Sequence, residues 1–423
     1  MAHCGLDFGT SNSTLGHIGA SGQPELLALE GNHSTIPSVL FFGFEDDRLH
    51  FGRAAIGEYV SGADGRLMRS LKSVLGTPLF ADRTRVKARQ LGFGEIIGSF
   101  VGELRRRAER SVGAELTQVV LGRPVHFVDD DPEADRAAQD QLERAVRAQG
   151  FLDIAFQYEP IAAALDYERQ VDAEKLALIV DLGGGTSDFS LVRVAPERRG
   201  HADRSSDILA TAGVHIGGTD FDRLLAMSRI MPELGLGTRT RDGKRHLPVA
   251  PYVDLSTWHR INRLYDAKAL RDLRSTAREA AYPHLVDTMV MLVEERLGHR
   301  LIGAVEDAKI ALSSASEVDF RFDVRDRRLA VTITAAELAA ALAEPIRRLE
   351  ATIAETLRRA GVYRDAVDSL ILTGGSTLVP AVADRLHALF PEAELVRTDV
   401  LGSVGLGLTL EAERVFGPAS AAR

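Results

Sequence analysis

The chain has 423 residues, of which 45% are hydrophobic and 26% charged, and this length and composition predict an ordinary folded protein with more than one lobe. With 51 basic against 60 acidic residues the formal net charge is −9, and no basic stretch is interleaved with aromatic residues, which argues against nucleic acid as a partner. There is no signal-peptide pattern, no apolar run long enough to cross a bilayer, and a single cysteine, so we expect a cytoplasmic protein without a membrane partner.

Strand-like runs alternate with helical patterns along the chain. Residues 117–125 indicate a strand, and residues 133–150 follow as an amphipathic helix that ends at a glycine. Residues 345–361 repeat the helical design, and a strand follows at 369–375. This alternation predicts an α/β fold with buried sheets. Residues from about 219 to 333 are polar and arginine-rich, and we interpret them as an inserted subdomain.

Two glycine-containing stretches share one pattern, in which an apolar lead-in is followed by Asp, an apolar residue, glycine and small polar residues. They are GLDFGTSNST at 5–14 and VDLGGGTSDFS at 180–190. In a tight hairpin of this kind, successive backbone N–H groups form an anion-binding nest that small residues leave open to phosphate oxygens. The repeat predicts two related halves, and two such hairpins facing each other would hold a polyphosphate from both sides.

Polar residues of these hairpins, together with one glutamate, are the first candidate site residues. Asp7, Asp181 and Asp188 are the acids of the two hairpins, and Mg²⁺ near phosphates is commonly held by one or two carboxylates. Glu159 precedes Pro160 at a predicted helix start, where a carboxylate either complements the helix dipole or faces an attacking water. The candidate amide donors are those of Thr10, Ser11, Asn12, Gly184, Gly185 and Thr186.

Eight motifs occur in a fixed order between about residue 5 and residue 410. They are GLDFGTSNST, GNHSTIPSVL, SLKSVLG, YEPIAAALDYE, IVDLGGGTSDFS, VHIGGTDFD, EDAKIALSS and LILTGGSTLVP. In this order they resemble the ATPase domain of the heat shock protein 70 (DnaK-type) chaperones, and most of all the short bacterial members of the YegD type. The resemblance implies a two-lobed actin-like ATPase fold, with duplicated ribonuclease-H-like lobes and an inserted subdomain.

The same resemblance implies a domain arrangement and a set of ligands. Lobe I would comprise 1–168 with a terminal helix at 402–416, and lobe II would comprise 174–400 including the insertion, with no peptide-binding domain. ATP or ADP would bind with Mg²⁺ in the cleft, and K⁺ is a further candidate cation. Because no substrate domain is expected, a nucleotide-switched ATPase of this kind would act through an unknown protein partner or client.

Individual roles follow from the matched motif positions. Asp7, Asp181 and Asp188 would organise Mg²⁺, mostly through water, and Lys72 and Glu159 would act with Thr186 in hydrolysis. The phosphates and the nucleoside would be held by Thr10, Ser11, Asn12, Gly184, Gly185, Thr186, Gly217, Gly218, Glu306, Lys309, Ser313, Gly374, Gly375 and Ser376.

Four positions depart from the family pattern. Leu378 stands where the family has an arginine that stacks on adenine, and the loss of that cation would weaken binding by ~0.5–2 kcal/mol. Thr219 replaces a usual glutamate, and Leu401 and Gly402 stand in the places of acidic residues. The change at 378 predicts a lower nucleotide affinity than is typical of the family.

Two other functions of the same superfamily remain as alternatives to a chaperone-like ATPase. A small-molecule kinase would need a polar acceptor pocket between the lobes, and the sequence shows no convincing acceptor motif. An actin-like filament former would share the GGGT turn and the Glu-Pro helix, but such relatives are shorter and lack Lys72 combined with the AKIALSS motif. We therefore favour a chaperone-like ATPase, with slow hydrolysis.

Overall fold

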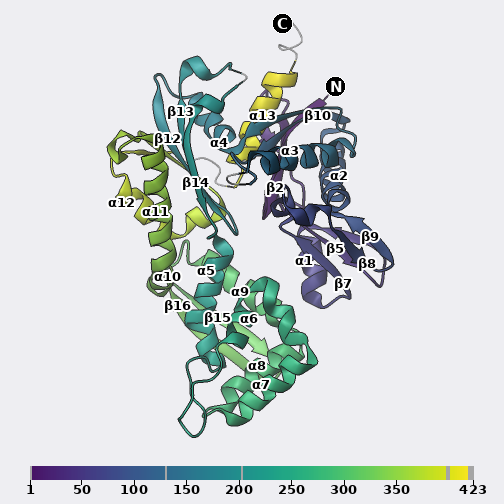
Figure 1. Cartoon of the computed structure of the whole chain (residues 1–423), viewed down its shortest axis with the longest axis vertical. Helices are drawn as coiled ribbons and strands as arrows, with labels where there is room; N and C mark the ends of the chain where they lie inside the picture. The colour runs from purple at the N-terminus through teal and green to yellow at the C-terminus, as the bar shows by residue number, and fades with distance from the viewer. Residues whose placement is uncertain (1, 129–130, 202, 397–400, 418–423) are drawn as a thin grey trace.

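Two α/β lobes lie side by side in the computed structural model, and an arm extends from each of them (Figure 1). The structure describes residues 2–128, 131–201, 203–396 and 401–417. Two helices lie between the lobes in Figure 1.

The sheet of lobe I has the strand order β11-β10-β1-β2-β3, with β4 also paired to β2. Strands β1 to β3 form antiparallel pairs, whereas β1, β10 and β11 run parallel. The strands are β1 (Ala2–Phe8), β2 (Asn12–Ile18), β3 (Pro24–Leu26), β4 (Thr35–Pro37), β10 (Leu116–Arg123) and β11 (Asp153–Tyr158). Helices α2 (Phe93–Val112) and α3 (Pro132–Arg147) bury their apolar faces in the same core.

The sheet of lobe II repeats this topology with the order β14-β13-β12-β17-β18. Three antiparallel strands again precede two parallel ones, so β12 corresponds to β1 and β13 to β2. The strands are β12 (Lys175–Leu182), β13 (Ser187–Val194), β14 (Ile208–Val214), β17 (Ser369–Thr373) and β18 (Glu394–Val396). Helices α11 (Ala343–Ala360) and α12 (Pro380–Leu389) complete this lobe. The prediction of an α/β fold with two related halves is confirmed.

The two helices between the lobes are α4 (Glu159–Glu168) and α13 (Ser403–Phe416). Helix α4 carries the chain from β11 of lobe I toward β12 of lobe II. Alanines and glycines at the α4–α13 contact allow a close crossing, since a Cβ atom on Gly407 would lie 1.9 Å from the carbonyl oxygen of Ala162. The pair forms a shared core with residues of both sheets.

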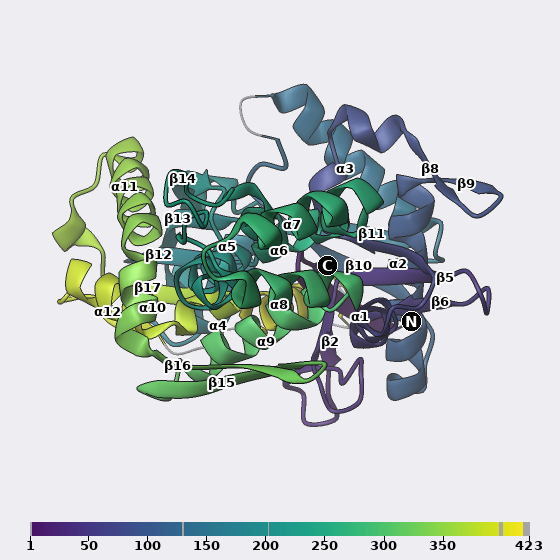
Figure 2. The same ribbon diagram turned by 90° about the horizontal axis from the view of Figure 1, so that it is seen from below.

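The arms are built from separate segments of the chain. The arm of lobe I contains β5 (Val39–Gly43), β6 (Leu49–Phe51), α1 (Gly52–Ser61), β7 (Gly65–Arg69) and the hairpin of β8 (Arg83–Val86) and β9 (Arg89–Gly92). The arm of lobe II follows β14, and its helices lie beside a β-hairpin in Figure 2. Its elements are α5 (Gly218–Leu225), α6 (Ala250–Ser256), α7 (Ala267–Glu279), α8 (Pro283–Glu294), α9 (Gly298–Ala311), β15 (Glu317–Val324) and β16 (Arg327–Thr334), which α10 (Ala335–Ala341) follows.

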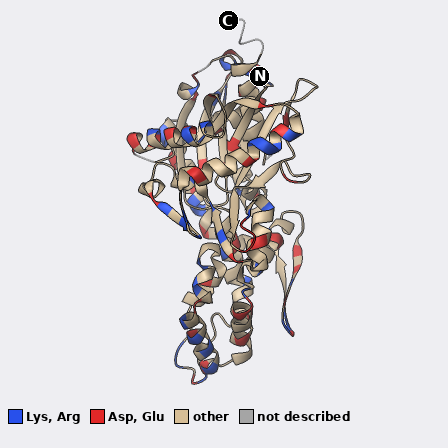
Figure 3. Ribbon diagram, turned by 90° about the vertical axis from the view of Figure 1, so that its right-hand side faces the viewer, with Lys and Arg blue, Asp and Glu red and all other residues tan. Residues whose placement is uncertain are grey.

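Charged residues of both signs are interspersed along the helices (Figure 3). On α2, for example, Glu103 pairs with Arg106 at 2.9 Å and with Arg107 at 2.8 Å, one helical turn away. Each such pair near the surface contributes about 0–1 kcal/mol to the free energy of unfolding. The pairs therefore keep the surface polar but do not determine the fold. In the described part of the chain, no helix is long and apolar enough to cross a membrane.

Candidate functional site

The two glycine hairpins predicted from the sequence meet between the lobes. The first turn joins β1 to β2 after Phe8, and the second joins β12 to β13 after Leu182. They contact each other closely, since a Cβ atom on Gly184 would lie 2.3 Å from the hydroxyl oxygen of Ser11. The structure therefore brings the predicted amide donors at 10–12 and 184–186 to one place.

Carboxylates converge where the two turns meet. Asp181 and Asp188 are direct cross-strand partners in the β12–β13 pair. Burial, together with the negative charges of Asp188, Glu159 and Asp7, raises the pKa of Asp181 to about 8. Burial likewise raises the pKa of Asp7 to about 7, with a contribution from Glu159. The site therefore concentrates negative charge that a cation would offset.

The donor set suits a magnesium ion that keeps part of its water shell. Within the described ranges, no three acidic, histidine or cysteine side chains are arranged to hold a metal by themselves. Mg²⁺ retains several waters and usually takes only one or two carboxylates beside phosphate oxygens. The predicted ligands Asp7, Asp181 and Asp188 fit that mode, in which phosphate and water complete the coordination.

Lys72 is the cation of this cluster. It lies on the short 3-10 helix η1 (Leu71–Val74), is 9% exposed, and forms an ion pair with Glu159, the first residue of α4. Burial opposes the charge of Lys72, but Glu159 and Asp7 raise its pKa above the ordinary value. A glycine on β10 leaves room for this carboxylate, since a Cβ atom on Gly122 would lie 3.2 Å from Cγ of Glu159.

Two further glycine-containing motifs, VHIGGTDFD and LILTGGSTLVP, hydrogen-bond to the backbone of the second turn. The backbone N–H of Gly218 donates to the carbonyl of Gly183 at 3.0 Å, and that of Thr219 to the carbonyl of Gly184 at 2.8 Å. The Thr219 hydroxyl donates to the same Gly184 carbonyl at 2.8 Å. From the motif LILTGGSTLVP, the Ser376 hydroxyl donates to the Gly183 carbonyl at 3.2 Å. The threonine that departs from the family pattern thus contributes directly to the shape of the turn.

The predicted nucleoside residues gather on α9 and on the glycine loops of lobe II. The Lys309 ammonium pairs with Asp222 at 2.7 Å and donates to the carbonyl of Gly218 at 3.3 Å. Glu306 lies one helical turn earlier on α9 and is exposed, and Ser313 follows the helix. Gly374 has a φ of 81°, and a Cβ atom added to it would lie 2.3 Å from the carbonyl oxygen of Leu182. Both the backbone conformation and the lack of space therefore require glycine at this position.

Asp222 is a candidate site residue that the sequence reasoning missed. It is 4% exposed, and burial raises its pKa to about 7 although Lys309 lowers it. The motif GGTDFD contains this acid, but nothing in the motif indicates that its partner is a lysine 87 positions later. Its contact fixes the Lys309 ammonium beside the Gly217–Gly218 loop.

Large apolar side chains are exposed on the segments that carry the nucleoside residues. Leu378, two positions after Ser376, is 49% exposed, and Ile310, next to Lys309, is 58% exposed. Leu401 is also 49% exposed, and its Cδ2 atom would lie 3.4 Å from a Cβ atom on Gly375. Leu378 and Leu401 therefore expose aliphatic side chains at positions where the family resemblance implies an arginine and an acidic residue.

A cavity of about 920 Å³ between the lobes reaches the same carboxylates. Glu159, Asp181, Asp188 and Thr373 border it, and the rest of its wall comes largely from α3, β14, α11 and the segment after β10. Because the predicted nucleoside residues of α9 do not line this cavity, it approaches the carboxylates from a different side.

Comparisons with known proteins agree with this geometry. The family model described as "Hsp70 protein" matches residues 3–231 and 286–413. The chaperone protein HscA of Edwardsiella ictaluri (strain 93-146) is 27% identical over 448 residues, covering 98% of this chain and 58% of that protein. The HscA homologue of Bordetella petrii is 27% identical over 432 residues, with the same two coverages. The chain thus spans less than two thirds of the length of these relatives.

Proposed function

The chain belongs to the Hsp70 family, and on that premise we propose that it is a Mg²⁺-dependent ATPase of chaperone type whose lobes close according to the bound nucleotide. The observation that supports this proposal is the placement of Lys72, Glu159 and the buried aspartates where the two phosphate-type turns meet. A buried cluster of perturbed acids around one lysine, in a cleft between lobes, is typical of a catalytic site.

In the proposed mechanism, the β- and γ-phosphates lie between the turns at 10–12 and 184–186. Mg²⁺, when bound, offsets the charge of the phosphates. Lys72 is a compact cation that adds to this electrostatic stabilisation, and Glu159 and Thr186 orient a water in line with the γ-phosphate. No residue needs to form a covalent intermediate, because positioning and electrostatics account for the acceleration in phosphoryl transfer of this type.

We also propose that the nucleoside binds against the Gly217–Gly218 and Gly374–Gly375 loops and α9. Lys309, held by Asp222, presents an ammonium to this pocket. The exposed Leu378 gives an aliphatic surface for the base in place of a cation, which fits a moderate affinity and slow turnover.

Two alternatives, a small-molecule kinase and a filament-forming ATPase, are not favoured by the family assignment. The relatives described above are named as chaperones. We therefore propose that nucleotide-driven lobe closure acts on a protein partner or client, in the cytoplasm, rather than on a small acceptor or on further copies of the chain.

Single-turnover hydrolysis of ATP, measured with and without Mg²⁺ and with no added acceptor, tests the proposal. We expect slow cleavage that depends on Mg²⁺. Tight ATP binding with no cleavage would overturn the hydrolytic part of the proposal, and the absence of binding would overturn all of it. Cleavage that starts only when an acceptor is added would indicate a kinase, and a species that sediments only with ATP would indicate a filament former.

A further inference from the structure

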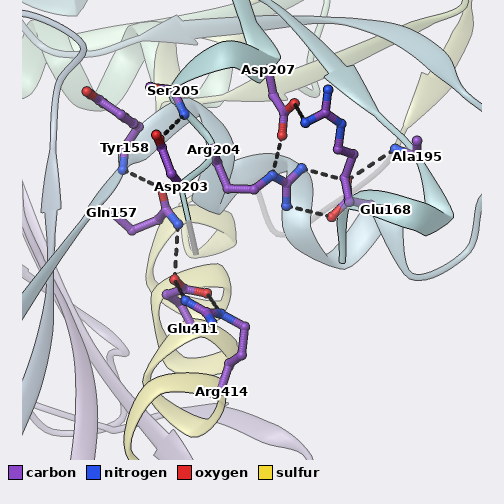
Figure 4. A network of polar contacts seen from close by, with 11 residues as sticks. Gln157, Tyr158, Glu168, Ala195, Asp203, Arg204, Ser205, Asp207, Glu411 and Arg414 are labelled. Atoms are coloured by element: carbon purple, nitrogen blue, oxygen red, sulfur yellow. Dashed lines mark hydrogen bonds and ion pairs between the residues drawn. The ribbon is translucent and has the colours of Figure 1, made fainter. Parts of the chain in front are cut away.

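Helix α4 ends in a buried ionic contact with lobe II (Figure 4). The guanidinium of Arg204 forms a two-pronged contact with the Glu168 carboxylate, at 3.0 and 2.7 Å. Both side chains are almost fully buried, with exposed fractions of 3% and 2%. Arg204 also pairs with Asp207, which Arg198 contacts at 3.2 Å. Arg204 and Asp207 belong to the segment between β13 and β14, so lobe II binds the last residue of α4.

Backbone contacts hold the same end of α4 to lobe II. Arg199 donates to the carbonyl of Glu168 at 2.9 and 2.7 Å, and the N–H of Ala195 donates to the Glu168 carboxylate at 3.2 Å. One residue earlier, the Tyr167 hydroxyl shares a hydrogen bond of 2.6 Å with Ser369 on β17. The C-terminal end of α4 is therefore part of lobe II.

The middle of α4 crosses a helix that belongs to lobe I. Helix α13 packs directly on β1, because a Cβ atom on Gly5 would lie 2.3 Å from the backbone nitrogen of Thr409. Its Glu411 accepts a hydrogen bond of 3.2 Å from Gln157 on β11 (Figure 4). Since Gly407 and Ala162 touch through their backbones, α4 has little room to slide along α13, and the crossing can act as a pivot.

The N-terminal end of α4 carries Glu159 on the lobe I side of this crossing. Glu159 contacts Lys72, which belongs to lobe I. Nine residue steps separate Glu159 from Glu168, so the ends of this helix are about 13.5 Å apart at 1.5 Å per residue. A helix held at one end, crossed tightly near Ala162 and carrying a catalytic carboxylate at the other end has the geometry of a lever.

We propose that Arg204 and Glu168 form a clamp that makes α4 such a lever, so that rotation of lobe II shifts Glu159 relative to Lys72. Arg204 is then a positioning residue for hydrolysis, and the inference rests on the function proposed above. The burial of the clamp supports this role. Removing charges from water offsets much of the attraction between them, so a buried ion pair is better suited to fixing a geometry than to adding stability.

The first test uses Glu168→Gln, which keeps the shape of the side chain. The double variant Arg204→Met/Glu168→Gln removes both charges of the clamp. Asp207, which also contacts Arg204, still pairs with Arg198 in this variant. The control is Arg385→Met, which breaks the ion pair with Glu350 elsewhere in lobe II. We expect single-turnover cleavage to fall at least tenfold in both clamp variants, with the ATP dissociation constant within threefold of wild type. Wild-type cleavage in the folded clamp variants would overturn the proposal.

A double-mutant cycle separates positioning from a merely structural role. If the clamp acts through Glu159, then adding Glu168→Gln to Glu159→Gln changes the residual cleavage rate by less than twofold. A structural defect would instead lower the rate again by the factor seen in the wild-type background, and that result would overturn the proposal.

Hydrogen exchange of residues 156–162 provides a readout that does not need hydrolysis. We expect ATP with Mg²⁺ to alter exchange in this segment in the wild type and in Arg385→Met, and to leave it unaltered in Glu168→Gln. If the wild type binds ATP without cleaving it, the proposal of hydrolysis is wrong. The difference in hydrogen exchange between the wild type and Glu168→Gln still tests the clamp in that case. An equal response in Glu168→Gln overturns the clamp, and so does a wild type that binds ATP without any response in this segment. A wild type that does not bind ATP overturns the proposed function instead.

Discussion

Lys72 and Glu159 form an ion pair across 87 positions of the sequence, and it joins the short helix η1 to the first residue of α4. Both side chains are largely buried, with exposed fractions of 9% and 16%. The ammonium and the carboxylate therefore offset each other's charge. In the proposed function, the γ-phosphate of ATP would compete with Glu159 for the ammonium, and the released carboxylate would then be available to orient water.

Replacing Lys72 by alanine tests this arrangement. We expect single-turnover hydrolysis to fall by about 10²-fold or more, as is found when one stabilising donor is removed from a transition state. ATP binding, measured by calorimetry, should remain largely intact, because the turns and the nucleoside loops are unchanged. Lys87→Ala is the control, since Lys87 is exposed and pairs with Asp47. Normal turnover of Lys72→Ala would contradict the assigned role.

Asp188→Asn is expected to weaken the Mg²⁺ dependence of nucleotide binding. The Asp188 carboxylate lies against β14, 2.6 Å from where a Cβ atom on Gly213 would be, and contributes charge next to Asp181. If it holds the ion through water, its loss should raise the Mg²⁺ concentration for half-maximal binding by about 10–100-fold. Titration of Mg²⁺ at fixed ATP measures this midpoint. Asp242→Asn, in an exposed turn, is the control, and a midpoint unchanged in Asp188→Asn would argue against the metal role.

Gly217→Ala should damage both stability and nucleotide binding. A Cβ atom at Gly217 would lie 2.5 Å from the backbone nitrogen of Gly185, so the loop or the phosphate turn must move. Overpacking of this kind costs about 1–3 kcal/mol, and we expect a lower unfolding midpoint together with weaker ATP binding. Gly303→Ala on α9 is the matched control, because its Cβ atom would meet nothing within 4 Å. If Gly217→Ala and Gly303→Ala have the same unfolding midpoint and the same ATP affinity, the close contact between Gly217 and Gly185 contributes to neither property.

The sequence predicts the fold well because its strongest signals are local. Each glycine hairpin is a contiguous segment, and the order of the motifs is sufficient to indicate two related lobes and the family, both of which are confirmed. Alternation of apolar residues likewise places β10 and α3 within a few residues of the bounds in the structure.

Contacts between distant segments could not be predicted in the same way. Two examples are the ion pairs of Asp222 with Lys309 and of Glu168 with Arg204. Both depend on how loops of lobe II pack on helices, and no periodic pattern in the sequence predicts these contacts. The roles assigned to Lys72, Glu159 and the other site residues stay predictions, although the structure places many of them together.

A second group that the sequence did not reveal joins the two arms. His299 on α9 contacts Tyr59 of α1 edge-on, with ring centroids 4.7 Å apart, and Trp258 at 4.8 Å. The His299 Nε2 atom lies 3.2 Å from both the Trp258 carbonyl and the Tyr59 hydroxyl, and the tautomer of the ring decides which of the two hydrogen bonds it makes. Asn262 donates to the Tyr59 hydroxyl at 2.8 Å. Neutral His299 therefore links the arm of lobe I to that of lobe II.

The charge state of His299 makes this contact sensitive to acid. Burial lowers the pKa of His299 to about 4, with a smaller contribution from the positive charge of Arg69, against an ordinary value of 6.5. Between pH 4 and 6.5 the unfolded chain binds more protons at this residue than the folded chain, so stability rises with pH and is lost as the pH falls. From pH 7 to pH 5 the loss due to His299 should be about 2 kcal/mol.

His299→Phe removes this titration while keeping a ring between Tyr59 and Trp258. We expect the variant to lose about 2 kcal/mol less than the wild type when the pH is lowered from 7 to 5, because no proton is taken up at position 299 on unfolding. Urea titrations followed by fluorescence measure the difference, and Trp258 reports on this contact directly because it is the single tryptophan of the chain. His33→Gln, at an exposed histidine, controls for general effects of acid. Parallel pH profiles for wild type and His299→Phe would show that His299 is not responsible for the acid sensitivity of the contact between the arms.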